Sequence, residues 1–224
     1  MSVDVAVVRV FTTRDGRLGN ELGLVWDSTE TAGREQAIAA ELGFSETVFV
    51  DTVAAGVAKI RIFTPADELP FAGHPSVGTA WWLRNQGSPL TTLAERAGDV
   101  AVAYDGDLTW ITGRAEWAPS FEWIELESPA DVDALNPAET MDGEKYFYAW
   151  IDESAGSVRS RMFAPDLGVF EDQATGSAAV ALTARLGRDL DITQGLGCRL
   201  FTKQLPDGFV RVGGYTVLDR SLRV

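Results

Sequence analysis

Alternating hydrophobic and polar positions recur along most of the chain and predict a protein dominated by β-strands. The alternating or β-branched runs lie between glycine, aspartate and proline residues, which commonly bound strands. We expect strands at residues 3–11, 46–51, 57–64, 99–104, 145–151, 209–214 and 215–219.

Helical patterns are fewer and of two kinds. Residues 29–43 are amphipathic and end on Gly43, which predicts a surface helix with a left-handed glycine cap. Residues 74–85 and 174–187 are small or apolar on nearly all sides. A helix without a polar face must be surrounded by protein, so these two segments predict buried helices.

The two buried helices belong to an internal repeat. The segments "RIFTP" and "RMFAP", which begin at Arg61 and Arg161, each precede one of them. Each copy reads as a strand, a loop with proline and a buried helix. The repeat therefore predicts two sheets related by a pseudo-twofold axis, each wrapped around one central helix.

An acidic segment separates the two halves. Residues 115–144 hold nine acidic side chains and no lysine or arginine, which is typical of a solvated face or connector. Aromatic residues within it indicate that part of it packs against the protein. We place the domain boundary at its start and expect domains at 1–114 and 115–224, with a last strand that could cross back to the first domain.

Composition and charge narrow the class of partner. The formal net charge of −14 would repel phosphate backbones and anionic lipid surfaces. One cysteine, Cys198, excludes an internal disulfide and a multi-cysteine metal site. The first residues lack the layout of a signal peptide, and no apolar run approaches the roughly 20 residues that span a bilayer. We expect a soluble, cytoplasmic protein with no nucleic-acid or membrane partner.

His74 and Asp172 stand where the two buried helices begin. The first N–H groups of a helix have no partner within it and carry partial positive charge, so they bind carboxylates well. If the two halves face each other, both helix N-termini open into one cleft suited to a small carboxylate or amino acid. Structural roles are the alternative, with Asp172 as a helix cap and His74 as a hydrogen-bonded loop residue.

Two further polar residues have a structural and a functional interpretation. Glu46 precedes an apolar strand in "FSETVFV", where an acid is often only an exposed strand start. Ser177 in "TGSAA" lacks the flanking pattern of a hydrolase nucleophile, and His74 is the only histidine that could activate it.

Three motifs, in this order, resemble the PhzF-like family of phenazine biosynthesis isomerases, which is related in fold to diaminopimelate epimerase and proline racemase. They read "FSETVFV", "RIFTPADELPFAGHPSVGTA" and "FAPDLGVFEDQATGSAAVAL". The resemblance covers nearly the whole chain. It implies a two-domain α+β protein in which each domain is a barrel-like, mostly antiparallel sheet around a central buried helix, with the active site between the domains.

The resemblance also implies roles for single residues. Glu46 corresponds to the glutamate that moves a proton as general acid/base, and His74 and Asp172 flank the same cleft. The substrate carboxylate would be held by Gly73, Gly176 and Ser177.

The sequence departs from related patterns in two ways. Epimerases of this fold use two cysteines at the helix N-termini, whereas Cys198 lies outside both motifs, so two-thiol racemisation is not expected. Glu21 replaces the proline of the family's "GNP" motif, and Gln173 replaces the proline of "EDPATGS". The catalytic trio is retained despite these changes, but it does not define the substrate specificity, which loops commonly carry.

We therefore expect a cofactor-independent isomerase that moves a proton on carbon in a small carboxylate substrate. No metal or cofactor is expected, because the chain has no second histidine, cysteine cluster or glycine-rich dinucleotide motif. One alternative is a non-catalytic protein that binds a small anion in the same cleft, and another is a scaffold whose partner docks on the acidic segment. Glu46 favours the enzyme, because a nearby carboxylate would weaken anion binding. The resemblance further implies a homodimer.

Overall fold

The computed structural model describes residues 2–26, 29–139, 142–165 and 169–224. Its strands form one continuous sheet in the order β1-β2-β3-β4-β6-β7-β8-β15-β14-β13-β11-β10-β9, and β5 and β12 are side strands on β4 and β11. The strands of the first half are β1 (Asp4–Thr12), β2 (Asn20–Trp26), β3 (Glu46–Ala54), β4 (Val57–Phe63), β5 (Glu68–Leu69), β6 (Thr92–Glu95), β7 (Gly98–Asp105) and β8 (Leu108–Arg114). Those of the second half are β9 (Glu122–Glu125), β10 (Lys145–Asp152), β11 (Ser157–Ala164), β12 (Val169–Asp172), β13 (Asp191–Gln194), β14 (Cys198–Gln204) and β15 (Phe209–Arg223).

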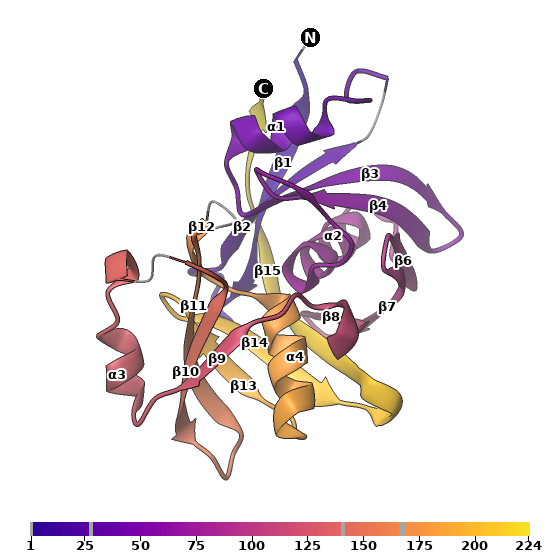
Figure 1. Ribbon diagram of the computed structural model, residues 1–224. Helices are drawn as coiled ribbons and strands as arrows, with labels where there is room; N and C mark the ends of the chain where they lie inside the picture. Colours follow the sequence, from indigo (N-terminus) through magenta and orange to yellow (C-terminus); the bar gives the residue numbers. More distant parts are fainter. Residues whose placement is uncertain (1, 27–28, 140–141, 166–168) are drawn as a thin grey trace.

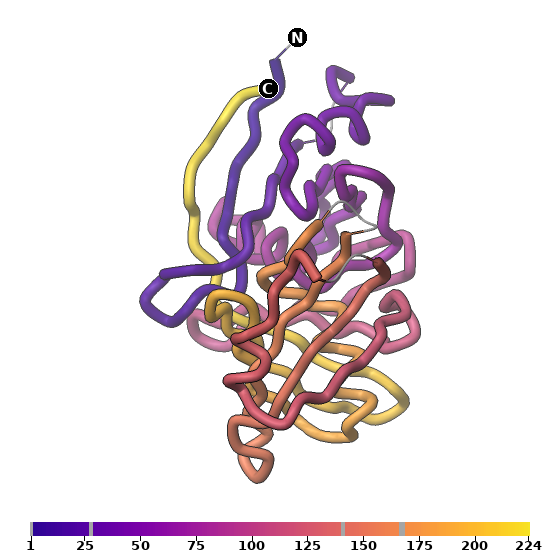
Figure 2. Tube along the Cα trace, turned by 60° about the vertical axis from the view of Figure 1, so that its left-hand side comes forward, coloured from indigo at the N-terminus to yellow at the C-terminus, as the bar shows by residue number. Residues whose placement is uncertain are grey.

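The first half is a closed barrel around one helix. The path from β1 through β8 reaches β15, and β15 pairs with β1 as well as β8, so the ring closes. Helix α2 (Gly73–Asn85) runs through this ring, as Figure 1 shows. The C-terminal part of β15 runs beside β1, so the two chain ends lie close together (Figure 2).

The second half repeats this arrangement around α4 (Gly176–Leu186), with β9 as the outer edge of its sheet. Most neighbouring strands are antiparallel, and the parallel pairs occur at matching places: β2–β3 and β4–β6 in one half, β9–β10 and β11–β13 in the other. The predicted α+β fold with a mostly antiparallel, barrel-like sheet around a buried helix is confirmed. The division into two domains at residue 114 stays a prediction.

The repeat extends to side chains that the sequence pattern aligned. Arg61 donates two hydrogen bonds to the carboxylate of Glu68, each 2.9 Å long. Arg161 does the same to Glu171, at 2.7 and 2.8 Å. Each arginine ties a side strand to the strand that carries it, because Glu68 lies on β5 and Glu171 on β12.

Both apolar helices are buried, as predicted. Ten residues of α2 and seven of α4 are buried, and the barrel strands approach α2 so closely that only glycine fits at Gly78. A Cβ there would lie 2.5 Å from Leu22 and 2.7 Å from Val10. None of the described helices combines the length and the apolar character needed to span a membrane.

Three sequence-based expectations need correction. Residues 209–214 and 215–219 form one strand, β15, because Gly213 and Gly214 do not end it: a side chain at these positions would overlap Trp110 or Phe11, which pack across the strand. The surface helix α1 (Glu35–Leu42) is shorter than expected and ends on Gly43, which has the predicted left-handed conformation.

The third correction concerns the acidic segment, which contributes to the folded sheet as well as connecting the halves. Its strand β9 pairs in parallel with β10, and it also contains the short helix α3 (Pro129–Asp133). Phe121 is buried against Trp123 and Tyr146. The aromatic residues therefore pack inward while most of the acidic side chains stay at the surface.

Candidate active site

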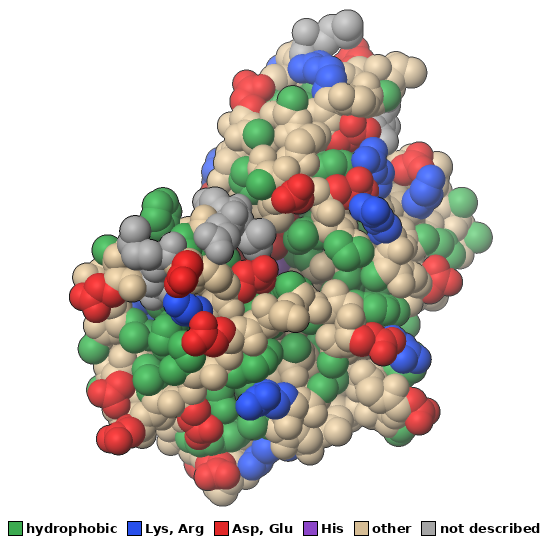
Figure 3. Space-filling view, in the orientation of Figure 1, with side chains coloured by type: hydrophobic (Ala, Val, Ile, Leu, Met, Phe, Trp, Pro, Cys, Tyr) green, Lys and Arg blue, Asp and Glu red, His purple; other side chains and the backbone are tan. Residues whose placement is uncertain are grey.

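A cavity of about 320 Å³ lies where the two halves meet. Hydrophobic side chains gather around the hollow in the middle of the face shown in Figure 3. The N-cap residues of both buried helices, Ala72 and Thr175, line this cavity, which confirms that the helix N-termini open into one cleft.

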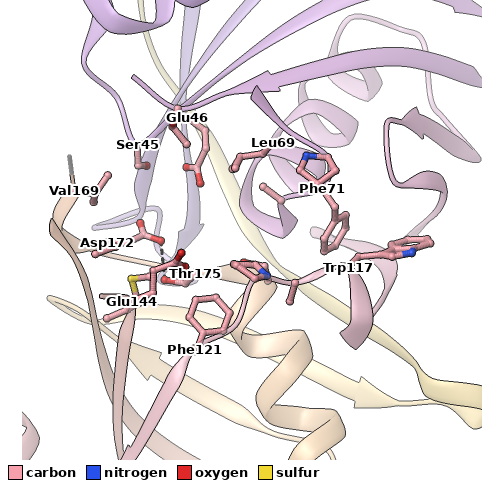
Figure 4. A pocket seen from close by; sticks show the side chains of 18 residues that line it. Ser45, Glu46, Leu69, Phe71, Trp117, Phe121, Glu144, Val169, Asp172 and Thr175 are labelled. Atoms are coloured by element: carbon pink, nitrogen blue, oxygen red, sulfur yellow. Dashed lines mark hydrogen bonds between the residues drawn. The ribbon is translucent and has the colours of Figure 1, made fainter. Parts of the chain in front are cut away.

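Glu46 and His74 form a hydrogen-bonded pair at the edge of the cavity. Glu46 is the first residue of β3, and its side chain reaches into the cavity (Figure 4). His74 lies on the first turn of α2, and its Nδ1 is 2.9 Å from Oε2 of Glu46. His74 is only 2% exposed and does not line the cavity, so it supports Glu46 from behind.

The second ring nitrogen of His74 fixes how the imidazole is protonated. Nε2 lies 3.2 Å from the carbonyl oxygen of Asn20, which can only accept a hydrogen bond, so Nε2 carries a hydrogen. Burial alone would lower the pKa of His74, but the hydrogen bond and charge of Glu46, the charge of Asp172 and the Asn20 carbonyl outweigh it, and the pKa is raised. The protonated ring donates from Nδ1 to the Glu46 carboxylate.

Asp172 lies near Glu46 in the cavity lining (Figure 4) and is held by residues of both halves. Asn20 donates from Nδ2 to Oδ1 of Asp172 at 2.5 Å, and the hydroxyl of Thr175 donates to Oδ2 at 2.7 Å. Thr175 is the N-cap residue of α4, yet its side chain makes no cap bond to the helix. The Asp172 carboxylate is therefore bound by side chains of Asn20 and Thr175 rather than serving only as the helix cap that the sequence left open.

Asp172 resists ionisation more than an ordinary aspartate. Burial raises its pKa to about 6, and the charge of Glu46 acts in the same direction. The charge of His74 and the hydrogen bonds from Thr175 and Asn20 lower it in part. The cavity lining thus holds the Asp172 carboxyl group near Glu46, with the His74 ring behind Glu46.

The N-termini of α2 and α4 lie against each other through two glycines. A Cβ on Gly73 would lie 2.8 Å from the carbonyl carbon of Gly176, and a Cβ on Gly176 would lie 2.6 Å from the amide nitrogen of His74. Neither helix has a side-chain cap. The N–H groups of the first turns therefore keep their capacity to bind an anion.

The structure brings all six predicted site residues to this junction, but in two layers. Glu46, Asp172 and Ser177 line the cavity. Gly73, His74 and Gly176 lie directly behind its lining, where they make the contacts between the two helix N-termini.

Sequence reasoning missed Asn20 and Gln194. Asn20 connects the two halves of the site, with its carbonyl on His74 and its side chain on Asp172. Gln194 donates to the backbone oxygen of Asp172 and to the hydroxyl of Thr175, at 2.9 and 2.8 Å. Asn20 belongs to the "GNELG" motif, but the only feature predicted from this motif was the replacement of proline by Glu21.

The walls of the cavity are apolar on one side and acidic on the other. The apolar side is formed by Leu69, Phe71, Trp117, Pro119, Phe121, Met162, Ala164 and Val169. The acidic side carries Glu144 in addition to Glu46 and Asp172, and no Lys or Arg is among the described residues that line the cavity. Across residues 2–26, 29–139, 142–165 and 169–224, no three His, Cys, Asp or Glu residues gather as metal ligands would.

Comparison with known proteins places these features in a family. The profile of the phenazine biosynthesis-like proteins matches residues 8–150 and 123–204. The trans-2,3-dihydro-3-hydroxyanthranilate isomerase of Pseudomonas aeruginosa is 31% identical over 215 residues, covering 79% of this chain and 77% of that protein. The enzyme of the same name from Pseudomonas chlororaphis is 34% identical over 225 residues, covering 80% of this chain and 81% of that protein.

Solved structures share the fold at low sequence identity. A PhzF-family phenazine biosynthesis protein of Bacillus anthracis superimposes with a TM-score of 0.80 at 20% identity, over 100% of this chain and 99% of that one. A probable proline racemase of Agrobacterium radiobacter superimposes with a TM-score of 0.70 at 10% identity, over 99% of this chain and 92% of that one.

Proposed function

This chain belongs to the phenazine biosynthesis-like (PhzF-like) protein family, and from that premise we propose that it is a cofactor-independent isomerase that moves a proton on carbon in a small carboxylate substrate. Glu46 is the general acid/base. The observation that carries the proposal is the Glu46–His74 pair, in which a carboxylate faces the cavity while a buried ring holds it in place.

The charge state of the pair suits proton abstraction. Because the imidazolium donates to Oε2, Glu46 is held as a carboxylate whose other oxygen is free to approach substrate. Glu46 takes a proton from one carbon, and the electron pair of the broken C–H bond spreads into the adjoining carboxyl-bearing system. The protonated Glu46, which can exchange its proton with water, then delivers a proton to a second carbon, which balances the reaction without an external acid.

The substrate carboxylate binds at the N-termini of α2 and α4. The uncapped first turns and the hydroxyl of Ser177 supply donors there, and His74 adds positive charge nearby. As negative charge develops on the substrate during proton removal, the same donors stabilise it. Asp172 orients the substrate from a position near Glu46, where Asn20 and Thr175 fix its carboxylate.

The walls favour a small ring as the rest of the substrate. Phe71, Trp117 and Phe121 offer apolar surface to a ring face, while Glu144 and Asp172 offer acceptors to hydroxyl or amino substituents. The relatives named above act on trans-2,3-dihydro-3-hydroxyanthranilate, so that compound is the first substrate to test.

A non-catalytic protein that binds a small anion in the same cavity is the alternative. Both proposals place an anion at the helix N-termini, so the acidic lining as a whole does not separate them. An anion-binding site would gain nothing from Glu46, which His74 holds towards the cavity, whereas proton transfer needs a base there. The Glu46–His74 pair therefore favours the isomerase.

One incubation separates the two proposals. The protein is mixed with trans-2,3-dihydro-3-hydroxyanthranilate, and isomer formation is followed by proton NMR alongside thermal stabilisation. An isomerase forms product in many-fold excess over protein. Saturable stabilisation without product would favour the anion-binding alternative.

Two further proposals concern assembly and location. We propose that the protein is a homodimer, as the family resemblance implies, which sedimentation over a wide concentration range tests. We also propose that it acts in the cytoplasm. A sedimentation coefficient of a monomer at every concentration would contradict the dimer.

A further inference from the structure

Glu95 is a buried carboxyl group that the proposed reaction does not use. It is the last residue of β6, it is 9% exposed, and it does not line the cavity. Its Oε1 lies 2.6 Å from the hydroxyl oxygen of Ser76, on the first turn of α2. Its Oε2 is buried, with no hydrogen-bond partner among the described residues.

The contacts of Ser76 require a second hydrogen. The Ser76 hydroxyl oxygen also lies 2.6 Å from the carbonyl oxygen of Ala72. A hydroxyl has one hydrogen, and a carbonyl can only accept, so the Ser76 hydrogen goes to Ala72. The equally short contact to Glu95 then needs a hydrogen on Glu95.

In the second half of the repeat, an amide side chain donates a comparable hydrogen bond. Gln194 is the last residue of β13, as Glu95 is of β6, and it donates to the hydroxyl of Thr175 at the start of α4. An amide carries its own hydrogens at every pH, whereas a carboxyl donates only when protonated. Glu95 in its protonated form bonds a hydroxyl on the first turn of α2, as Gln194 bonds the hydroxyl of the N-cap residue of α4.

We propose that Glu95 is a neutral carboxylic acid in the folded protein, that it donates to Ser76, and that this bond positions the turn that carries Gly73 and His74. Glu95 is thus a positioning residue, and the inference goes beyond the proposed reaction and does not depend on it. An ionised Glu95 would instead place a buried charge beside one hydroxyl, with its second oxygen unpaired.

The surroundings favour the neutral form. Burial raises the pKa of Glu95 to about 8, and the hydrogen bond with Ser76 lowers it only in part. No charged group shifts the pKa of Glu95. The neighbouring Arg96 lowers the pKa of Glu68 instead. The other ionisable residues on the surrounding elements α2, β4, β5, β7 and η1 (Ala115–Trp117) are His74, Arg84, Lys59, Arg61, Glu68, Asp99, Tyr104, Asp105 and Glu116.

The proposal makes folding depend on pH in a defined window. The pKa of Glu95 is about 8 when folded and near 4.5 when exposed, so between these values the folded protein holds one proton more than the unfolded chain. The contribution of Glu95 to stability is complete below pH 4.5 and is lost as the pH rises towards 8. Glu95→Gln keeps a donor for Ser76 and removes this dependence.

Urea unfolding of the full chain from pH 5 to 9 tests the proposal on wild type, Glu95→Gln and Glu122→Gln. Glu122 is an exposed glutamate on β9 and is the matched control. The ratio of the unfolding equilibrium constants, wild type divided by Glu95→Gln, should rise about tenfold per pH unit up to about pH 8. Glu122→Gln should follow wild type. A constant ratio of wild type to Glu95→Gln across this range would overturn the proposal.

NMR tests protonation and positioning separately, and the test of protonation needs only wild type, so it holds even if Glu95→Gln does not fold. In wild type labelled with ¹³C-glutamate, one carboxyl resonance should titrate near pH 8. If every glutamate instead titrates below about pH 6, Glu95 is not a neutral acid. The single histidine reports position: the signals of His74 should show a step near pH 8 that Glu95→Gln removes. Identical His74 titrations in the two folded proteins would refute the positioning role.

Discussion

Gly73 and Gly176 touch through their backbones, and this contact joins the N-termini of the two buried helices. A Cβ on Gly73 would lie 2.8 Å from the carbonyl carbon of Gly176, closer than non-bonded carbon atoms can approach. The carboxylate site that we propose needs both helix N-termini at one place, so it depends on the absence of side chains at these two positions.

Gly73→Ala should therefore separate the helix N-termini. We expect a loss of unfolding free energy of about 1–3 kcal/mol, as for other overpacked sites, and a raised KM because the carboxylate donors move apart. Urea unfolding and steady-state kinetics measure the two effects. The control is Gly87→Ala, where a Cβ meets no atom within 4 Å and the only cost is the left-handed φ of 83°, so it should lose stability without a raised KM. A Gly73→Ala enzyme with unchanged KM would show that the helix N-termini do not bind substrate.

Asn20→Asp should convert a hydrogen bond into a contact between two carboxylates. The side chain keeps its size but loses the amide that donates to Asp172 at 2.5 Å. We expect the pKa of Asp172 to rise above about 6 and the fold to lose roughly 1–3 kcal/mol from the unsatisfied pair. The fall of kcat/KM at low pH, the acid limb of the pH–rate profile, reports the pKa of Asp172. Urea unfolding reports the loss of stability. Asn85→Asp makes the same change in charge at an exposed position, where it loses one hydrogen bond to the Trp81 carbonyl, and it should leave the acid limb unchanged.

The pH dependence of kcat/KM should be bell-shaped. As the pH falls through about 6, Asp172 takes up a proton and loses its fixed acceptor geometry, so the rate falls. As the pH rises through the raised pKa of His74, above 6.5, the imidazolium is lost and the rate falls again. Asp172→Asn should lower the rate and remove the acid limb. A profile flat from pH 5 to 9 would contradict the roles of both groups.

Arg161→Lys should reduce activity more than Arg61→Lys, although the repeat gives both arginines the same two-pronged contact. Lysine cannot keep both bonds to a carboxylate, so each change should cost about 1–2 kcal/mol of stability. Only Glu171, the partner of Arg161, directly precedes Asp172. Arg61→Lys is the matched control. An equal loss of kcat/KM in both variants would show that the contact of Arg161 with β12 does not position Asp172.

The parts of the fold that the sequence predicts best are those where local pattern and burial agree. Residues 74–85 and 174–187 lack a polar face, and that property alone placed both helices inside the sheets. The break expected at Gly214 was wrong, because those glycines make room for Trp110 and Phe11 from other strands. Packing partners far away in the sequence leave no local signal.

The candidate site was only partly accessible to sequence reasoning, for the same reason. Glu46 and His74 lie 28 residues apart, on a strand and a helix, and only the family resemblance linked them before the structure. Asn20 and Asp172 are 152 residues apart and meet because the two halves face each other. Glu95 has no sequence signal at all, since a glutamate at a strand end is normally solvated.

The most direct test of the central claim, that Glu46 moves the proton, is deuterium incorporation from D₂O during turnover of trans-2,3-dihydro-3-hydroxyanthranilate. Wild type, Glu46→Gln and the surface control Glu122→Gln are compared by mass spectrometry of product and recovered substrate. Glu46→Gln keeps the size and hydrogen-bonding reach of the side chain but cannot accept the proton. We expect deuterium in the product with wild type and Glu122→Gln, and a rate lower by at least about 100-fold with Glu46→Gln, which should still bind substrate within about tenfold of the wild-type affinity. Deuterium incorporation by Glu46→Gln at the wild-type rate would contradict the account.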